Sequence, residues 1–231
     1  MAPLMRTSAR LSWRSAWLLT ALISAGCDDP QETSADAALL CGGPEWAPGR
    51  RLTQLEYVNV VHDLLGIDAA PTWPSDASSV GFDNQVEAQP LSYQHVEAMF
   101  ATAQLVAADA TADIEALTGC GAVPADEGAC ARDFIARFGR LAFRRPLSAE
   151  EGERFIELFE EGLAENDFST AIALVLQAML VDPAFHFRFE VGQGAVDDEG
   201  NVALSGLEVA SRLSFMLWSS SPDAALLDAA E

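Results

Sequence analysis

A helix-start signature that occurs three times constrains the fold of this chain most strongly. In each copy a Ser or Thr is followed three residues later by Glu, beside a run with helical apolar spacing. The three pairs are Thr53–Glu56, Ser148–Glu151 and Ser205–Glu208. The hydroxyl and the carboxylate of such a pair satisfy amide groups that a helix leaves free at its N-terminus. The sequence therefore predicts a mainly α-helical fold, an orthogonal or irregular bundle of about six to seven helices with a long packed loop.

Further caps and stops place the other helices. The predicted helices cover residues 53–66, 92–117, 129–143, from 148 onwards, 169–180, 205–218 and from 222 onwards, where Pro222 takes the first helical position. The helix at 169–180 is apolar nearly all round, which predicts a buried central position. Residues 185–190 alternate between apolar and polar and fit a short strand or a final helical turn equally well. The segment 68–90 is long for an irregular connection, so we expect it to be packed or functional.

Composition excludes several classes of function. The 231 residues are 50% hydrophobic, enough to bury the core of one domain or two small ones. With 35 acidic and 13 basic residues, the formal charge of -22 repels phosphate backbones, and we expect no nucleic-acid partner. Every basic residue is Arg, which excludes lysine-based nucleophiles and phosphate loops. The sequence also has no serine-hydrolase elbow, zinc-protease motif or dinucleotide-binding turn.

The first 26 residues have the layout of a secretory signal. Three arginines precede an apolar run at 16–23 that is too short for a permanent membrane span. Residues 24–27, Ser-Ala-Gly-Cys, resemble the lipobox of bacterial lipoproteins, which predicts a lipid on Cys27. The alternative is ordinary cleavage, with Cys27 left as a thiol or a disulfide partner. We expect a protein of the cell envelope, anchored in a membrane and facing the periplasm or the cell surface.

The chain after this signal divides into a tether and helical segments. The predicted parts are a flexible tether at 27–48, a first helical module at 49–118, a second at 119–191 and the start of a third at 203–231. The sequence ends inside the last predicted helix. We therefore expect the N-terminal portion of a longer protein.

The cysteines indicate a disulfide rather than a catalytic thiol, because an exported protein meets an oxidising compartment. Cys120 and Cys130 flank a Gly- and Pro-containing loop, and we favour a bridge between them. Cys41 then has a partner beyond residue 231, stays a free thiol or pairs differently. No C-x-x-C-H motif attaches a c-type haem within the chain, so we expect no cofactor here.

Arginines are the most informative charged residues in this acidic chain. Five are candidates for binding an anion or a partner: Arg51, Arg140, Arg144, Arg145 and Arg212. Guanidinium groups form paired hydrogen bonds with carboxylates, either of a ligand or of the protein itself. We favour the second role, with Asp63, Asp83 or the glutamates of the helix that starts after Ser148 as structural partners.

The histidines and acidic turns do not predict a metal site. His186 and Glu190 lie four residues apart and could share a helix face, but no third ligand accompanies them. The oxygen-rich segments at 83–84 and 197–201 do not follow the twelve-residue calcium-loop pattern. Solvated turns account for both segments.

Several short motifs, in order along the chain, carry a family resemblance. They include Arg50-Arg51-Leu52-Thr53, Gly81-Phe82-Asp83-Asn84, Phe138-Gly139-Arg140, Phe143-Arg144-Arg145-Pro146-Leu147 and Ala210-Ser211-Arg212-Leu213-Ser214. Together they resemble the multi-module secreted proteins of planctomycetes and myxobacteria that are built from domains of unknown function. The resemblance implies further modules downstream and, in some members, association with c-type cytochrome domains. Haem is thus expected only in a downstream module or a partner.

These observations lead to one functional expectation and one alternative. We expect an extracytoplasmic, lipid-anchored helical module that serves as a binding or assembly part of a larger protein. Its expected partners are the membrane, through the lipid, and a cytochrome or another extracytoplasmic protein. The alternative is the N-terminal part of a redox-linked or hydrolytic enzyme that downstream modules complete. No catalytic residue is assigned.

Overall fold

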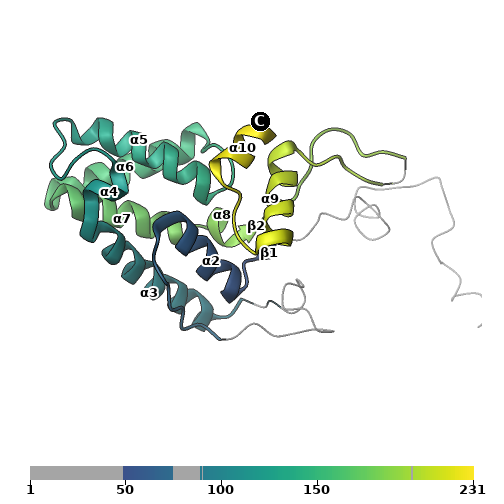
Figure 1. Ribbon diagram of the computed structural model, residues 1–231, viewed down its shortest axis with the longest axis horizontal. Coiled ribbons are helices and arrows are strands. Elements are labelled where there is room, and N and C mark those ends of the chain that lie inside the picture. The colour runs from purple at the N-terminus through teal and green to yellow at the C-terminus, as the bar shows by residue number, and fades with distance from the viewer. Residues whose placement is uncertain (1–48, 75–88, 90, 199) are drawn as a thin grey trace, which may run out of the picture. The chain divides into compact units, whose positions relative to one another are not determined.

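The computed structural model describes residues 49–74, 89, 91–198 and 200–231 (Figure 1). All of them belong to one compact unit. The elements in chain order are β1 (Arg50–Arg51), α2 (Gln54–Leu65), α3 (Tyr93–Ala110), the 3-10 turn η2 (Thr111–Asp113), α4 (Ile114–Thr118), α5 (Glu127–Ala142), α6 (Ala149–Glu165), α7 (Phe168–Val181), α8 (Pro183–His186), β2 (Phe187–Arg188), α9 (Gly206–Trp218) and α10 (Ala224–Ala230). The prediction of a mainly α-helical fold is confirmed.

The helix starts follow the local chemistry of the sequence. Capping boxes are formed at Thr53, Ser148 and Ser205, as predicted, and a further one joins Ser92 to His95. Helix α2 ends where Gly66 adopts a φ of 69°, a left-handed conformation that glycine accepts without a steric penalty.

Two predicted helices have different boundaries in the structure. The single helix expected at 92–117 is divided, because the Thr111 hydroxyl bonds back to the Ala107 carbonyl and Asp113 caps the new helix α4. The last helix does not begin at Pro222. The Asp223 carboxylate accepts the N–H of Leu226 at 2.8 Å, so Asp223 is the cap and Pro222 precedes it.

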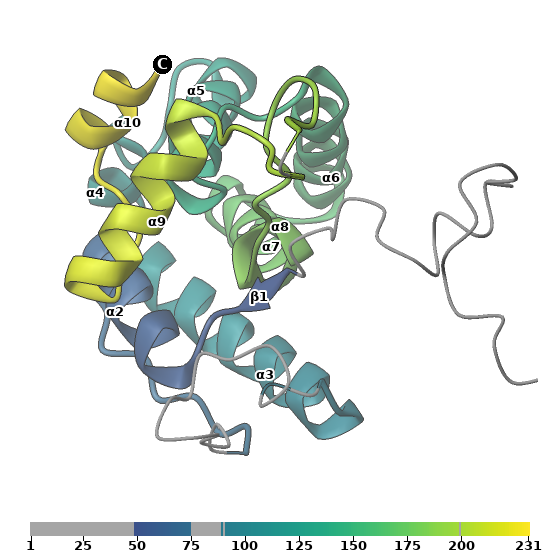
Figure 2. The same cartoon turned by 90° about the vertical axis from the view of Figure 1, so that its right-hand side faces the viewer.

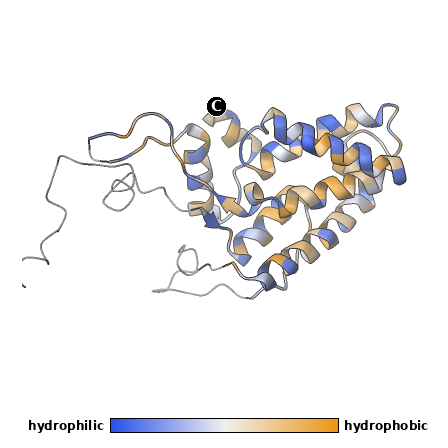
Figure 3. Cartoon of the chain, turned by 180° about the vertical axis from the view of Figure 1, so that it is seen from behind, coloured by the Kyte–Doolittle hydropathy of each residue, from blue (hydrophilic) through white to orange (hydrophobic). Residues whose placement is uncertain are grey.

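Helix α7 forms the centre of the core, as its apolar sequence predicts. It packs against α3 on one side and α6 on the other (Figure 1), and Figure 3 shows that it is predominantly hydrophobic. Seven of its residues are buried: Phe168, Ala171, Ile172, Val175, Leu176, Met179 and Leu180. Gly162 lets α6 approach closely, since a Cβ there would lie 3.3 Å from the Ala171 Cα.

Segment 185–190 contains both of the elements that its sequence allows, the end of a helix followed by a short strand. The short helix α8 ends at His186, and β2 then pairs antiparallel with β1, with Arg51 opposite Phe187. The Leu52 N–H extends the pairing by donating to the His186 carbonyl at 2.7 Å. Strand β1 therefore joins the beginning of the described chain to the α7–α8 region (Figure 2).

Several predictions fall outside the described residues. They are the signal at 1–26, the tether at 27–48 with Cys27 and Cys41, and most of the 68–90 segment, including Asp83. Within the described ranges, no helix combines the length and the hydropathy required to cross a bilayer.

Candidate functional site

Buried charged side chains gather where β1, β2, the start of α2 and the end of α5 come together. Four of them are at most 7% exposed: Arg51, Glu56, Arg144 and Arg188. Burial of charge is costly unless each group finds hydrogen bonds or an opposite charge. The hydrogen bonds and ion pairs of each charged group therefore indicate whether it stabilises the fold or is available to a ligand.

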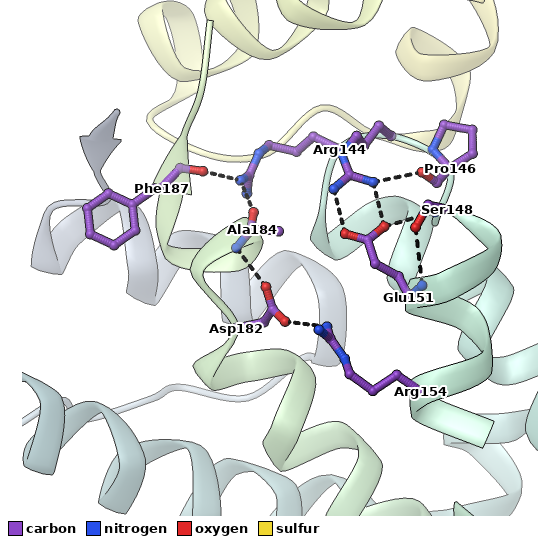
Figure 4. A network of polar contacts seen from close by, with 9 residues as sticks. Arg144, Pro146, Ser148, Glu151, Arg154, Asp182, Ala184 and Phe187 are labelled. Carbon is purple, nitrogen blue, oxygen red and sulfur yellow. Dashed lines mark hydrogen bonds and ion pairs between the residues drawn. The ribbon is translucent and has the colours of Figure 1, made fainter. Parts of the chain in front are cut away.

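Arg144 binds the ends of two helices. Its Nη1 donates to the carbonyls of Ala142 and Phe185, both at 3.1 Å. Its Nη2 donates to those of Ala184 and Phe187, as Figure 4 shows. Such carbonyls are the acceptors that helix C-termini leave free, and a cation is favourable there. Arg144 has a φ of 59° at the turn after α5, a strained conformation for a non-glycine residue. Arg144 therefore has an internal role, as we favoured, but its acceptors are backbone carbonyls and not the carboxylates expected.

Electrostatics at Arg144 agree with that internal role. Burial, together with the nearby charges of Arg188 and Arg145, lowers the pKa of the Arg144 guanidinium to about 9. A pKa of about 9 still keeps the group protonated at neutral pH, and four carbonyl oxygens accept its hydrogen bonds.

Arg145 forms a two-point ion pair with Glu151. The Arg145 Nη1 and Nη2 lie 2.8 Å and 2.7 Å from the two carboxylate oxygens. Glu151 also completes the capping box with Ser148 (Figure 4). The Arg145 hydrogen bonds, aided by those of Ser148, lower the pKa of Glu151 to about 2. This pair fixes the entry into α6 rather than presenting a free cation.

Arg140 and Arg212 also pair within the chain. Arg140 donates to Asp228 at 2.7 Å and to Glu231 at 3.0 Å, not to the glutamates of α6. Arg212 forms an ion pair with Glu190. In both cases the carboxylate is distant in sequence, so spacing along one helix does not reveal it.

Arg51 and Asp63 are the remaining described residues that the sequence singles out. The Arg51 guanidinium is buried and donates from Nη1 to the Leu52 carbonyl at 2.9 Å. The Asp63 carboxylate accepts from the Ser220 hydroxyl at 2.6 Å. Among the described residues, no arginine forms an ion pair with Asp63, whose Oδ1 lies 3.6 Å from the His62 Nδ1.

Arg188 is the site residue that sequence reasoning missed. It is 7% exposed, its Nη2 lies 3.4 Å from the Glu56 Oε1, and its guanidinium carbon lies 4.4 Å from the ring centre of Phe215. Among the residues that the structure describes, neither its Nε nor its Nη2 has a hydrogen-bond partner. Burial lowers the pKa of Arg188, which the charge of Glu56 opposes. One feature of the sequence indicates its burial. Residues 185–190 alternate between apolar and polar, and a strand places every second residue on the same side.

A cavity of about 310 Å³ adjoins Arg188. It lies between the end of α5, β2 and the start of α9, and both apolar and charged side chains line it. On its α9 wall, the Glu208 carboxylate accepts the N–H groups of Val191, Gly192 and Ser205. Although partial burial opposes the shift, these hydrogen bonds lower the pKa of Glu208.

A second buried group consists of aromatic rings with polar atoms. His186 stacks on Tyr57 at 5.6 Å between ring centres, and Trp73 lies 4.8 Å from Tyr57. Burial, with a smaller contribution from the charges of Arg51 and Arg144, lowers the pKa of His186 to about 4, and burial raises that of Tyr57. His186 is therefore a neutral core residue. No cluster of three or more metal-ligating side chains occurs among the residues that the structure describes.

The predicted disulfide is confirmed. Cys120 and Cys130 are bonded, with their Cα atoms 6.1 Å apart, and they link the end of α4 to the first turn of α5. The bridge lies at the opposite end of α5 from Arg144.

Three family models match successive segments of the chain. Each model describes a protein of unknown function. PSD3 (DUF1587) matches residues 50–112, PSD5 (DUF1595) matches residues 130–190, and PSD4 (DUF1592) matches residues 204–231. This is a multi-module protein of DUF1587, DUF1595 and DUF1592 domains. No curated protein and no solved structure matches the chain.

The three segments share one polar interior. The DUF1587 segment contributes Arg51 and Glu56, the DUF1595 segment contributes Arg144 and Arg188, and the DUF1592 segment contributes Phe215 beneath Arg188. The cavity beside Arg188 likewise has walls from both the DUF1595 and the DUF1592 segments.

Proposed function

We propose that this chain is the binding or assembly part of a larger extracytoplasmic protein, attached to the membrane through a lipid on Cys27. The observation that supports it most is an exposed apolar face on α9. Four large apolar residues are exposed there: Val209 at 42%, Leu213 at 40%, Met216 at 68% and Leu217 at 61%. Their spacing of four, seven and eight residues places them on one side of the helix.

The opposite side of α9 is already packed. Ala210, Ser214 and Phe215 are buried against the rest of the chain. A helix that is apolar on both sides is typical of an element enclosed between two packed layers, and contiguous exposed apolar surface marks an interaction site. The outer side of α9 is thus the proposed interface.

The proposed occupant is an apolar helical surface of another module of the larger protein. Two copies of this chain would each bring a formal charge of -22, and that repulsion opposes self-association. From the family resemblance, we expect the partner to be a cytochrome-bearing module or another extracytoplasmic module.

Site-specific photo-crosslinking in the producing cells tests the interface. A photoreactive phenylalanine analogue replaces Met216, and the matched control places it at the exposed Glu157 of α6. We expect Met216, and not the control, to crosslink to an apolar helical peptide of another module, identified by mass spectrometry. Met216→Glu should abolish a crosslink from Leu213. Crosslinks only to a second copy of this segment, or equal yields at both positions, would overturn the proposal.

Membrane fractionation tests the anchor separately. Cys27→Ala should release the protein from membranes, whereas the control Cys41→Ala should leave it attached. Unchanged retention of the Cys27→Ala protein would contradict lipid anchoring without affecting the α9 interface.

A further inference from the structure

We propose that the cavity beside Arg188 binds an organic carboxylate with an apolar body, and that the carboxylate meets the Arg188 guanidinium. This site is independent of the α9 interface, which lies on the outer side of that helix. Three observations support it: the incomplete bonding of Arg188, the saturation of the neighbouring arginines and the chemistry of the cavity walls.

The bonding of Arg188 is incomplete for a buried cation. A guanidinium has five N–H donors, and buried donors in proteins almost always have acceptors. Within the described part of the chain, the Arg188 Nε and Nη2 have none, and Glu56 approaches Nη2 only to 3.4 Å. The contact with the Phe215 ring offsets part of the charge but accepts no conventional hydrogen bond. Because these two nitrogens are themselves enclosed, a carboxylate in the cavity would balance the charge of the guanidinium and meet it at the atoms that border the cavity.

The two other arginines that line the cavity cannot take this role. The Nη atoms of Arg144 donate to four backbone carbonyls, and Arg145 is held by Glu151 at two points. Both still add positive potential at the cavity. Arg188 is therefore the arginine of this cavity that the contacts within the described chain leave for a ligand.

The cavity walls favour a carboxylate over a phosphate. Phe143, Phe187 and Leu207 line the cavity and suit an apolar or aromatic body, and about 310 Å³ is within the range of small-ligand sites. A charged hydrogen bond between a guanidinium and a carboxylate is stronger than one between neutral groups. Glu208 on the wall repels a doubly charged phosphate more strongly than a singly charged carboxylate.

Calorimetric titration of the full chain tests the ligand class. The probes are benzoate, its uncharged analogue benzamide and inorganic phosphate. We expect benzoate to bind at least about tenfold more tightly than benzamide, because a charged hydrogen-bonding pair is lost in the amide, and we expect phosphate to bind more weakly than benzoate. Equal affinity for benzoate and benzamide, tighter binding of phosphate, or no binding of benzoate would overturn the proposal.

A pair of dipeptides distinguishes two sources of the carboxylate. Acetyl-Ala-Phe is titrated with a free C-terminus and with an amidated one. Tighter binding of the free acid than of benzoate identifies a protein C-terminus as the ligand, whereas preference for benzoate identifies a small free acid. Both outcomes presuppose that benzoate binds more tightly than benzamide, and if it does not, the proposal is rejected whatever the dipeptides show.

Two variants locate the site. Arg188→Gln should weaken benzoate binding at least about tenfold, while Arg132→Gln, the same charge change at an exposed residue outside the cavity, should leave it unchanged. Because Arg188→Gln also leaves Glu56 without its cation, Ser211→Phe provides a second route, filling the cavity from α9 with the Arg188–Glu56 pair intact. Retention of benzoate binding by a folded Ser211→Phe protein contradicts the proposed location.

Discussion

The Nη2 of Arg140 lies 2.7 Å from the Oδ1 of Asp228, a residue 88 positions later in the chain. Together with the contact from Arg140 Nε to Glu231, this pair joins α5 to α10. It connects the DUF1595 segment with the DUF1592 segment at the protein surface.

Arg140→Gln should therefore have a small effect that depends on salt. Exposed ion pairs contribute little, and ionic strength screens them. We expect a slightly lower urea midpoint than wild type in dilute buffer and no difference at about 1 M salt. A large loss that persists at high salt would show that α10 is held mainly by this contact.

Arg144→Gln should be one of the most destabilising substitutions in the chain. Glutamine cannot reach the four carbonyls that Arg144 binds, and we expect a loss of about 3–5 kcal/mol in the free energy of unfolding. Arg144→Lys should not restore it, because an ammonium group cannot reproduce the planar fork. Denaturant unfolding provides the measurement, with Arg132→Gln as a control within about 0.5 kcal/mol of wild type.

Stability should fall as the pH is lowered through the titration range of His186. The pKa of His186 is about 4 in the folded protein, against 6.5 as its ordinary value. The unfolded chain therefore binds a proton first: stability is complete above pH 6.5 and decreases between pH 6.5 and 4, by up to about 3 kcal/mol.

His186→Phe isolates this contribution. The variant should lose most of the pH dependence in that window, whatever its absolute stability, whereas His62→Gln at an exposed position should keep it. Urea unfolding at a series of pH values gives the comparison. Identical slopes for wild type and His186→Phe would show that His186 is not the titrating group.

Removal of the disulfide should loosen the junction between α4 and α5. The bridge closes a short loop, with a sequence separation of 10, so Cys120→Ser combined with Cys130→Ser should cost about 2–3 kcal/mol. Thermal unfolding with and without reductant checks this. The double variant should be insensitive to reductant, and a wild type that is equally insensitive would contradict a stabilising bridge.

The sequence predicts the helix starts well because their chemistry is local. The Thr53–Glu56 box bonds two residues three positions apart, and any chain with this spacing can form it. The boundary near Pro222 was wrong for a similarly local reason, because Ser221 and Asp223 are both suitable caps and the helix begins after Asp223.

The site is less predictable because its contacts are distant and involve the backbone. Arg144 binds carbonyls 40 to 43 positions away, and a carbonyl has no signature in the sequence. A charge pattern suggests that an arginine needs an acceptor, but it does not show whether that acceptor is a ligand, a carboxylate or a helix end. The burial of Arg188 arises only when β2 pairs with β1.

That pairing has a consequence for the gene as well as for the protein. Strand β1 comes from the first residues of the DUF1587 segment and β2 from the last residues of the DUF1595 segment, and α3 of the former packs on α7 of the latter. A recombination event that removed one segment would leave the other with an unpaired strand edge and an uncovered apolar helix. The two segments, although matched as separate modules, should therefore be inherited, exchanged and lost as one piece.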